Sequence, residues 1–350
     1  MRIVFVSWRD LAHPQAGGAE VVLDHLAVGL RDRGHEVALV CGGPVATRPY
    51  RVIRNGGTYS QYVEVPLTFW RHARDADVVV DVENGIPFFS PLWQRSPVVC
   101  LVHHVHTDQW SMQFPPPVAA IGRWLEVRVM PRVYRRALFV TVSESTRQGL
   151  VELGVDGARI RTVVMGSEPG AGIGPRSETP RFLVLGRLVP HKRVVLALRM
   201  WDQVRPRTGG KLVIVGDGPA RPALERAAGP DVVFLGHLAP ERKARELGAA
   251  WLLVHPAHHE GWGTVVMEAA GSGLPTIAFD VPGLRDSIVD GTTGVLARDE
   301  RSFVDEWIRL ACDSAARDQM AQAAQQRAAS YPWARAITEF EACLREAAGR

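Results

Sequence analysis

Two glutamates in the segment HHEGWGTVVMEAAGSGLP could act on a single ligand. Glu260 and Glu268 lie eight positions apart in this stretch, which covers residues 258–275. In a continuous helix, that spacing would place both carboxylates roughly on one face. Gly261 and Gly263, however, disfavour a helix at the start of the segment. The residues are therefore compatible with a catalytic pair, a helix cap or a cradle for a ligand.

A second candidate group is cationic. Arg187 and Lys192 bracket the turn in GRLVPHKR, which follows an apolar run at residues 182–185. The chain has only three lysines, and one of them lies here. Arginine offers a fork of donors and lysine a compact charge, so the two together predict a site for a diphosphate. The alternative is a pair of solvated surface cations.

Glycines stand where a ligand could approach the backbone closely. Gly17 and Gly18 open a predicted helix, and a helix N-terminus without side chains leaves N–H groups open to a phosphate. Gly216 and Gly218, in GDGP, could admit a base or ribose. The alternative at both places is a plain turn. A G-x-G-x-x-G turn does not directly follow the first strand, so an NAD site is disfavoured.

Three histidines follow the apolar run at residues 98–102. A metal site would need further ligands, and the neighbouring strand ends offer no obvious cysteine or acid cluster, so we expect no metal. A single histidine that bonds a polar substrate or shuttles a proton fits better, with His103 the first choice and His104 its rival. The alternative is a structural histidine whose bonds are satisfied within the fold.

Other polar residues near strand ends have two interpretations. Asn84 and the following Pro87-Phe88-Phe89 either line an acceptor pocket or pack in the interior. Asp75 and Asp77 form a DxD pair of the kind that metal-dependent sugar transferases use. They precede a strand, whereas ligands bind beyond the carboxyl ends of strands in a doubly wound sheet. We therefore expect these two acids to be solvated turn residues.

Alternating strands and helices must position all these residues. Short apolar runs rich in β-branched residues alternate with helical stretches, which is typical of parallel sheets covered by helices. Helices are expected at residues 18–33 and 334–348. The predicted fold is α/β, with two doubly wound, Rossmann-like domains and a cleft between them. The strands are expected at residues 3–6, 37–40, 78–82, 98–102, 138–142, 182–185, 212–215, 232–235, 252–255 and 276–279.

Length and composition set the domain boundaries. A chain of 350 residues suits two domains of about 150 residues each. The stretch GSEPGAGIGPRSETPR lacks periodicity and is the best linker candidate. We predict an N-terminal domain at residues 1–168, a linker at 169–180 and a second domain at 181–332. Residues 333–350 are expected to form a helix that packs back on the first domain.

Composition also limits the cellular setting. Four scattered cysteines without CxxC spacing fit a reducing compartment, and no leader or membrane-spanning run is evident, so a cytoplasmic protein is expected. Residues 123–136 carry five arginines among aromatic and aliphatic side chains. This segment is either a solvated helix flank or a surface that docks on an anionic membrane at its inner face. No nucleic-acid-binding module accompanies the charge, so nucleic acid is not expected as a partner.

Together, the helix-opening Gly-Gly, the strand-end histidine, GRLVPHK, VGDGP and EGWGTVVMEAAGSGLP resemble glycosyltransferase family 4. Members are retaining enzymes with the GT-B fold and an E-x7-E signature, which corresponds here to Glu260 and Glu268. The order of the motifs matches over nearly the whole chain. The sequence departs from the family at Met165-Gly166, where an Asn-Gly pair is frequent.

The resemblance implies a role for each matching position. Glu268 would hold the ribose of a nucleotide-sugar donor and Glu260 the sugar hydroxyls, while Arg187 and Lys192 would neutralise the diphosphate. His103 would touch the donor sugar, with His104 as its close rival, and the first domain would bind the acceptor while the second binds the nucleotide sugar. Asn84 and His104 are expected to face the acceptor because of their positions after strands, and no family motif marks them. The remaining donor-binding positions would be Gly17, Gly18, Gly216, Gly218, Gly261, Trp262, Gly263, Thr264 and Val265.

The implied reaction moves a hexose from GDP-mannose or a UDP-hexose to a hydroxyl, without a metal or other cofactor. Two cations and helix N-termini would stabilise the departing diphosphate. The acceptor, lipid-linked, polysaccharide or a small molecule, is not identified by any motif. An epimerase or hydrolase acting on a nucleotide sugar with the same fold is the alternative enzyme, and a non-catalytic nucleotide-sugar binder is the third interpretation.

Overall fold

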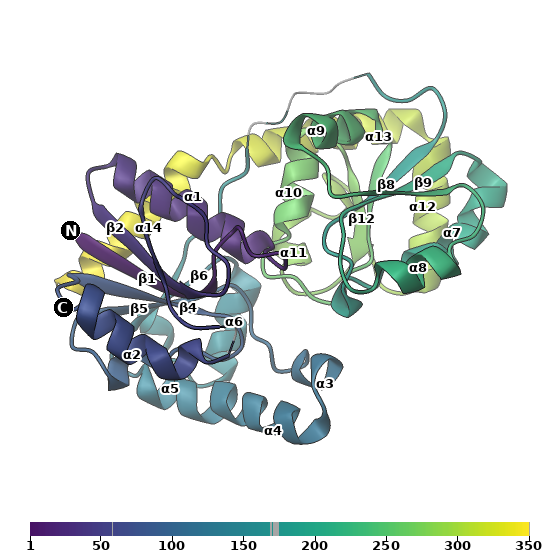
Figure 1. The fold of residues 1–350 in the computed structure, drawn as a ribbon. Helices are drawn as coiled ribbons and strands as arrows, with labels where there is room; N and C mark the ends of the chain where they lie inside the picture. The colour runs from purple at the N-terminus through teal and green to yellow at the C-terminus, as the bar shows by residue number, and fades with distance from the viewer. Residues whose placement is uncertain (58, 169, 171–174, 350) are drawn as a thin grey trace. The chain divides into compact units, whose positions relative to one another are not determined.

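The chain forms two compact units (Figure 1). The computed structural model describes residues 1–57, 59–168, 170 and 175–349. The first unit comprises Met1–Met165 together with Trp333–Arg350, and the second comprises Gly166–Pro332. Residues 169 and 171–174 of the predicted linker lie outside the described residues.

A parallel sheet forms the centre of the first unit. Its strand order is β3-β2-β1-β4-β5-β6-β7. Successive residues of the central strands are buried, as expected for strands covered by helices on both faces. The strands are β1 Arg2–Arg9, β2 Glu36–Gly42, β3 Arg51–Arg54, β4 Val78–Glu83, β5 Val98–Val102, β6 Leu138–Thr141 and β7 Ile160–Thr162.

The helices of the first unit come from both ends of the chain. Helix α14, Trp333–Ala348, lies beside α1, Gly18–Asp32, although more than 300 residues separate them (Figure 1). Gly29 on α1 makes room for Ile337, because a Cβ at Gly29 would lie 2.2 Å from the Ile337 Cδ1 atom. The other helices are α2 Gln61–His72, α3 Trp110–Gln113, α4 Pro116–Trp124, α5 Met130–Val133 and α6 Glu144–Glu152, with a π-helical turn at Leu125–Val129.

A second parallel sheet forms the centre of the other unit. Its order is β10-β9-β8-β11-β12-β13. The strands are β8 Arg181–Leu185, β9 Lys211–Val215, β10 Val232–Gly236, β11 Leu252–His255, β12 Thr276–Phe279 and β13 Gly294–Ala297. The helices are α7 Val194–Thr208, α8 Arg221–Ala227, α9 Pro240–Ala249, α10 Thr264–Gly271, α11 Leu284–Ser287, α12 Glu300–Cys312 and α13 Ser314–Ala329.

Both sheets are doubly wound, which confirms the predicted fold class. The strand order reverses between β1 and β4 in the first unit and between β8 and β11 in the second. Ligands bind such sheets beyond the carboxyl ends of the strands, at the point of reversal. All ten predicted strands are present, and the sheets also contain β3, β7 and β13, which were not predicted. Within the described part of the chain, no helix has the length and apolarity needed to span a bilayer.

Candidate functional site

Two loops meet at the switch point of the second unit. The loop after β8 carries Arg187 and Lys192, and the loop after β11 carries Glu260. These strands are parallel neighbours, so their loops leave the same edge of the sheet together. The His258 N–H donates to the His191 carbonyl at 2.9 Å, which ties one loop to the other.

Glu260 is held by two basic side chains. Its Oε1 atom accepts a bond from the Lys192 ammonium and another, at 2.7 Å, from Nε2 of His255. The carboxylate is only 13% exposed. Burial by itself would raise the pKa of Glu260, but the Lys192 charge and the His255 bond together hold it well below the ordinary value. Glu260 is therefore a charged hydrogen-bond acceptor and is poorly suited to serve as a general acid.

The loop after β8 brings positive charge to this edge. Burial, together with the charge of Lys192, lowers the pKa of His191 to about 4, and Arg187 acts in the same direction. His191 is therefore neutral at pH 7, and its ring adds no charge to that of the two cations. Arg187 is half-buried in this loop. A dianionic group placed here would meet one guanidinium and one ammonium.

Glu268 lies one helix turn or more into α10 and forms an ion pair with Lys243 on α9. Both side chains are about one-third exposed, at 29% for the acid and 34% for the lysine. Helix α10 begins after Gly263, whose φ of 72° is left-handed, a conformation that favours glycine. Thr264 and Val265 form the first turn, where the helix dipole favours an anion.

The glycine-rich step before α10 buries its tryptophan. Trp262 is 5% exposed, and its ring packs edge-on against Tyr331 with a centroid distance of 5.4 Å. Only the backbone of Gly261 and Trp262 is thus suited to meet a ligand. The ring instead anchors the loop to the end of the second unit.

Gly216 and Gly218 are required for contact between two loops. A Cβ at Gly216 would lie 1.9 Å from the Gly186 carbonyl oxygen, and one at Gly218 would lie 2.5 Å from the Leu188 oxygen. Their φ angles of 129° and 158° are also rarely adopted by other residues. The glycines therefore let the loop after β9 pack directly on the loop after β8.

At the first switch point, the start of α1 differs from expectation. The Gly17 N–H donates to Oε2 of Glu20 at 2.6 Å, and Oε1 of Glu20 accepts a 2.8 Å bond from buried Arg9. The Gly17 N–H group is therefore occupied by an acid of the same helix, because Glu20 stands at the third helical position. Gly18 opens the helix, as predicted.

The strand-end histidine His103 is buried and only 7% exposed. Its carbonyl accepts a bond from the Thr146 hydroxyl, which fixes the backbone at the end of β5. Within the described residues its Nε2 atom has no hydrogen-bond partner. Burial lowers the pKa of His103 to about 4, so the ring is neutral at pH 7. His104 is half-buried, and its ring lies 4.0 Å from that of His106.

The same edge holds an acid cluster that the sequence did not predict. Glu83 ends β4 and Glu126 lies in the π-helical turn, and each has an oxygen 3.9 Å from Nδ1 of His106. Glu126 also accepts bonds from the His106 N–H (2.5 Å) and the Trp110 indole (2.9 Å). Burial, and then the charge of Glu126, raises the pKa of Glu83 well above its ordinary value. The expectation that no acids meet these histidines is therefore wrong.

The two ambiguous segments of the first unit have clear structures. Phe88 is buried and stacks on Tyr62, so it belongs to the core, while Asn84 beside it is half-buried. Asp75 and Asp77 bind the side chain and backbone of the residue that opens β1. They are turn acids at the amino end of β4, as expected.

Several site residues were not singled out as such by the sequence. His255 lies within a predicted strand, and Lys243 is marked in the sequence only by the rarity of lysine. That rarity was the available signal, because Lys192 and Lys243 are the two that bind the E-x7-E glutamates. Glu126 was not recognised as a site residue because it lies in a segment that carries five arginines and was interpreted as a basic surface.

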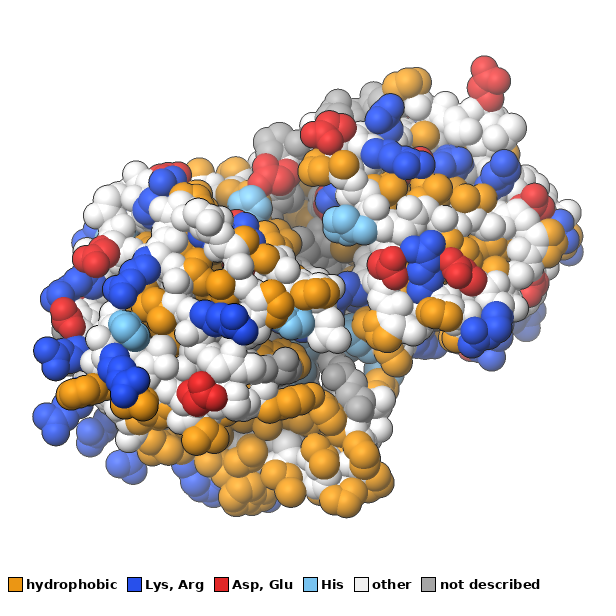
Figure 2. Space-filling model, viewed as in Figure 1, with side chains coloured by type: hydrophobic (Ala, Val, Ile, Leu, Met, Phe, Trp, Pro, Cys, Tyr) orange, Lys and Arg blue, Asp and Glu red, His pale blue; other side chains and the backbone are white. Residues whose placement is uncertain are grey.

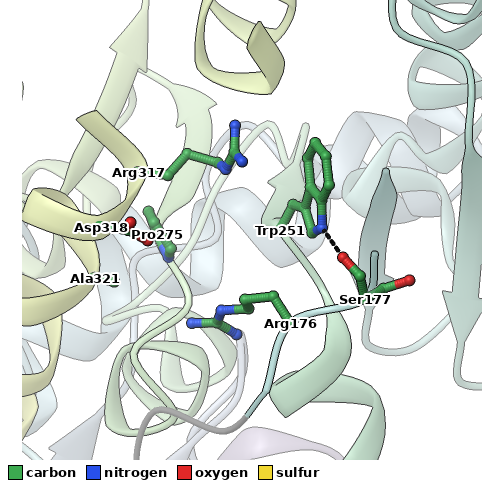
Figure 3. A pocket seen from close by; sticks show the side chains of 7 residues that line it. All are labelled: Arg176, Ser177, Trp251, Pro275, Arg317, Asp318 and Ala321. Carbon is green, nitrogen blue, oxygen red and sulfur yellow. Dashed lines mark hydrogen bonds between the residues drawn. The ribbon is translucent and has the colours of Figure 1, made fainter. Parts of the chain in front are cut away.

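A pocket of about 190 Å³ lies elsewhere in the second unit (Figure 3). Trp251 and Pro275, which line it, directly precede β11 and β12 and so lie at the amino ends of those strands. The Trp251 indole donates to the Ser177 carbonyl at 2.7 Å, and the Arg317 guanidinium lies over the Trp251 ring. This pocket is at the opposite edge of the sheet from Lys192 and Glu260.

Comparison with known proteins matches both units to glycosyltransferases. Residues 16–167 match the profile described as Glycosyltransferase Family 4, and residues 179–313 match Glycosyl transferases group 1. D-inositol 3-phosphate glycosyltransferase of Nocardia farcinica is 30% identical over 95% of this chain and 86% of its own length. Glycogen synthase of Mycobacterium tuberculosis is 29% identical, covering 95% and 92%. GDP-mannose-dependent alpha-mannosyltransferase of Corynebacterium glutamicum is 24% identical, covering 95% and 82%.

Solved structures share the fold over nearly the whole chain. Sucrose-phosphate synthase from Thermosynechococcus elongatus superposes with a TM-score of 0.84 at 18% identity, covering 99% of this chain and 98% of the other. Anabaena Alr3699/HepE in complex with UDP and glucose superposes with a TM-score of 0.80 at 17% identity, covering 99% and 100%. At such identities the likeness concerns the fold.

Proposed function

The chain belongs to glycosyltransferase family 4 and has its GT-B fold, and from this premise we propose a retaining, metal-independent hexose transfer. The donor is a nucleotide-diphosphate sugar, either GDP-mannose or a UDP-hexose, and the acceptor is a hydroxyl. One observation carries the proposal: Lys192 and Glu260 are joined at the switch point of the second unit, with Arg187 in the same loop.

The donor site divides between the two glutamates. Glu268 accepts hydrogen bonds from the ribose hydroxyls, and Glu260, kept charged by Lys192 and His255, accepts them from the sugar hydroxyls. The first turn of α10 lies between the two acids and offers its dipole to the diphosphate. Gly261 allows the backbone to approach the sugar because it carries no side chain.

Arg187 and Lys192 stabilise the negative charge of the departing diphosphate. Cleavage of the anomeric bond builds negative charge on the diphosphate and oxocarbenium character on the sugar. Two preorganised cations stabilise the former, and the loss of one such contact typically costs about 10²–10³ in rate. Lys192 has three donors, so it can keep its bond to Glu260 and also contact a phosphate oxygen.

Retention follows from attack on the face from which the diphosphate leaves. The departing phosphate oxygen takes the proton of the acceptor hydroxyl, so no carboxylate nucleophile is required. Glu260 is a poor nucleophile here because its charge is already engaged by Lys192 and His255. In the first unit, His103 is the residue we assign to the donor sugar, and Asn84 and His104 are assigned to the acceptor.

The surface of α4 supports peripheral membrane binding. Val118, Ile121 and Trp124 are 47–60% exposed, and Figure 2 shows hydrophobic side chains gathered over α3 and α4. Arg128 and Arg132 are exposed nearby and line a groove of about 610 Å³ together with Trp124. Apolar side chains flanked by arginines suit the interface of an anionic bilayer. We therefore favour a cytoplasmic enzyme at the inner face of a membrane, with a lipid-linked or membrane-proximal acceptor.

Donor binding and turnover test this proposal. Calorimetric titration with UDP, GDP, UDP-glucose, UDP-N-acetylglucosamine and GDP-mannose identifies the base and the sugar. Turnover with that donor is then followed by NMR across lipid-linked, polysaccharide and small-molecule acceptors, and the anomeric coupling of the product reports retention. Epimerised or hydrolysed donor without a glycosyl product in any acceptor mixture would overturn the transferase proposal in favour of the alternative enzyme.

A further inference from the structure

Three side chains in the first unit converge on one buried point. Glu83, at the end of β4, His106, after β5, and Glu126, in the π-helical turn, each direct one ligand atom there, and these atoms lie within 4.8 Å of one another. The Nδ1 atom of His106 is 3.9 Å from an oxygen of each carboxylate. Both glutamates are only 1% exposed.

The charges in this cluster are not balanced by the protein. Both oxygens of Glu83 are buried, and in the part of the chain that the structure describes the Gly85 N–H is the one donor that acts on this carboxylate, without meeting full hydrogen-bond geometry. Among the described residues, His106 is the basic side chain that comes within ion-pair distance of either glutamate. Buried Asp81, two residues before Glu83 on β4, adds to the negative potential. An uncompensated buried carboxylate is strongly unfavourable, so the pair needs either a proton or a bound cation.

We propose that Glu83, His106 and Glu126 bind one divalent transition-metal ion, for which Zn²⁺ is the natural choice. One imidazole nitrogen and two carboxylate oxygens suit Zn²⁺ or Co²⁺, whereas Mg²⁺ and Ca²⁺ prefer oxygen ligands alone. A tetrahedral ion with bonds of about 2.0–2.2 Å needs ligand atoms roughly 3.4 Å apart. The side chains therefore need to close by only about 0.5–1.4 Å, and a water would take the fourth position.

The surroundings hold the ligands in place. Glu126 receives hydrogen bonds from the His106 backbone and the Trp110 indole, which orient its carboxylate toward His106. Such bonds to a ligand carboxylate are typical of metal sites. Glu126 also lies in a π-helical turn, a rare geometry that often marks functional sites. Gly122 makes room for Trp110, since a Cβ there would lie 2.4 Å from its ring.

The ion would join three separate segments. It would fasten β4 and the π-helical turn to the loop that contains His104 and His106, at the carboxyl edge of the first sheet. Its role is to position this loop, and it is separate from the metal-independent chemistry assigned to Arg187 and Lys192. The inference does not depend on the identity of the donor or the acceptor.

Metal binding by the full chain tests the site. Protein stripped with a chelator is titrated with Zn²⁺ by calorimetry, and with Co²⁺ while the visible absorption is recorded. We expect wild-type protein to bind one more Zn²⁺ than Glu83→Gln and to show Co²⁺ bands that this variant lacks. Zn²⁺, but not Mg²⁺, should raise the melting temperature of wild type. Glu144→Gln, an exposed acid of the same unit, serves as the matched control and should behave as wild type.

Surface histidines and cysteines also bind Zn²⁺, so the difference between variants is the decisive quantity. Equal stoichiometry in wild type and Glu83→Gln, or wild-type protein without Co²⁺ bands, would overturn the proposal. The cluster would then share a proton instead of holding an ion. If Glu83→Gln fails to fold, His106→Asn provides the same comparison, because it removes the nitrogen ligand and keeps the backbone N–H that Glu126 binds.

Discussion

Lys243 on α9 forms an ion pair with Glu268 on α10, so the carboxylate that we assign to the donor ribose already has a cation beside it. An exposed pair of this kind contributes little to stability, typically 0–1 kcal/mol. We infer that the pair serves to orient Glu268, whose side chain has three rotatable bonds. Lys192 holds Glu260 in the same way, and the two pairs fix both acids of the E-x7-E segment.

Replacing Lys243 by Met should therefore weaken donor binding rather than slow the chemical step. We expect the donor KM to rise about fivefold, which corresponds to about 1 kcal/mol, with kcat nearly unchanged. Lys243→Arg should restore most of the affinity. Lys211→Met, which alters the third, exposed lysine at the start of β9, is the control. A lower KM in Lys243→Met would show that the lysine competes with the ribose for Glu268.

Lys192→Ala should lose both rate and stability. Turnover should fall by about 10²–10³ because a cation is lost from the diphosphate. The free energy of unfolding should fall by about 2 kcal/mol at pH 7. This is less than the cost of leaving a buried carboxylate with no partner at all, because His255 still binds Glu260. Unchanged kinetics would contradict the assignment of Lys192.

The stability loss in Lys192→Ala should depend on pH in one direction. Folding lowers the pKa of Glu260. The stabilisation by its ion pair is therefore fully present above the pKa of a glutamate in the unfolded chain, about 4.3, and it disappears as the pH falls toward the pKa of Glu260 in the folded chain. Denaturant titrations of wild type and variant should therefore begin to converge only below about pH 4, and they should coincide only as the pH approaches the lowered pKa of Glu260. A gap that widens on acidification would exclude Glu260 as the partner.

His103 should make the fold sensitive to mild acid. Its pKa falls from 6.5 to about 4 on folding, so between these pH values the unfolded chain binds a proton at His103 that the folded chain does not bind. The contribution of His103 therefore lowers the free energy of unfolding as the pH falls from 6.5 to 4. In His103→Gln this loss should be smaller, whereas His72→Gln, an exposed residue of α2, should titrate as wild type. Parallel pH profiles for wild type and His103→Gln would refute the burial of a neutral imidazole.

Membrane binding should depend on the apolar residues of α4. Ile121→Ser combined with Trp124→Ser should abolish flotation with vesicles that contain phosphatidylglycerol. Arg128→Gln should weaken it about fivefold at low salt, since each basic residue near such a surface is worth about 1 kcal/mol. Val195→Ser, a substitution at a similarly exposed apolar site on α7, should have no effect. Flotation that survives the double substitution would remove α4 from the interface.

The transfer reaction should not need an added metal. The clearest test uses Glu83→Gln, because this variant lacks the proposed ion of the first unit. Its initial rate should be the same with EDTA and without it, and Mn²⁺ should not increase it. Strong inhibition that Mn²⁺ reverses would mean that Arg187 and Lys192 are insufficient for the diphosphate.

The strands that the sequence failed to predict share one property. β3, β7 and β13 are all edge strands of three or four residues. An edge strand has one neighbour and needs less apolar surface, so its residues do not stand out from a loop. Nine of the ten predicted strands are central strands, which are buried on both faces in a parallel sheet and read as apolar runs. The tenth, β10, is an edge strand that was identifiable because its sequence, VVFLG, is apolar.

The sequence predicted which residues belong to the site, but it did not predict which of them contact one another. Positions after strands identified Arg187, Lys192 and Glu260 as ligand-edge residues, because every parallel strand ends at the same edge. The bonds from Lys192 and His255 to Glu260 depend on the order of the strands, which the motifs do not specify. The meeting of Glu83 with Glu126 was harder still, since it brings a strand end together with a π-helical turn 43 positions later.

The packing of α14 on α1 has a consequence for biosynthesis. The second unit is complete once residue 332 has left the ribosome, whereas the first still lacks the helix that covers Phe5 and fills the space beside Gly29. The unit that is made first is therefore finished last. During translation of the intervening residues, Phe5 and the face of α1 that packs against α14 stay uncovered.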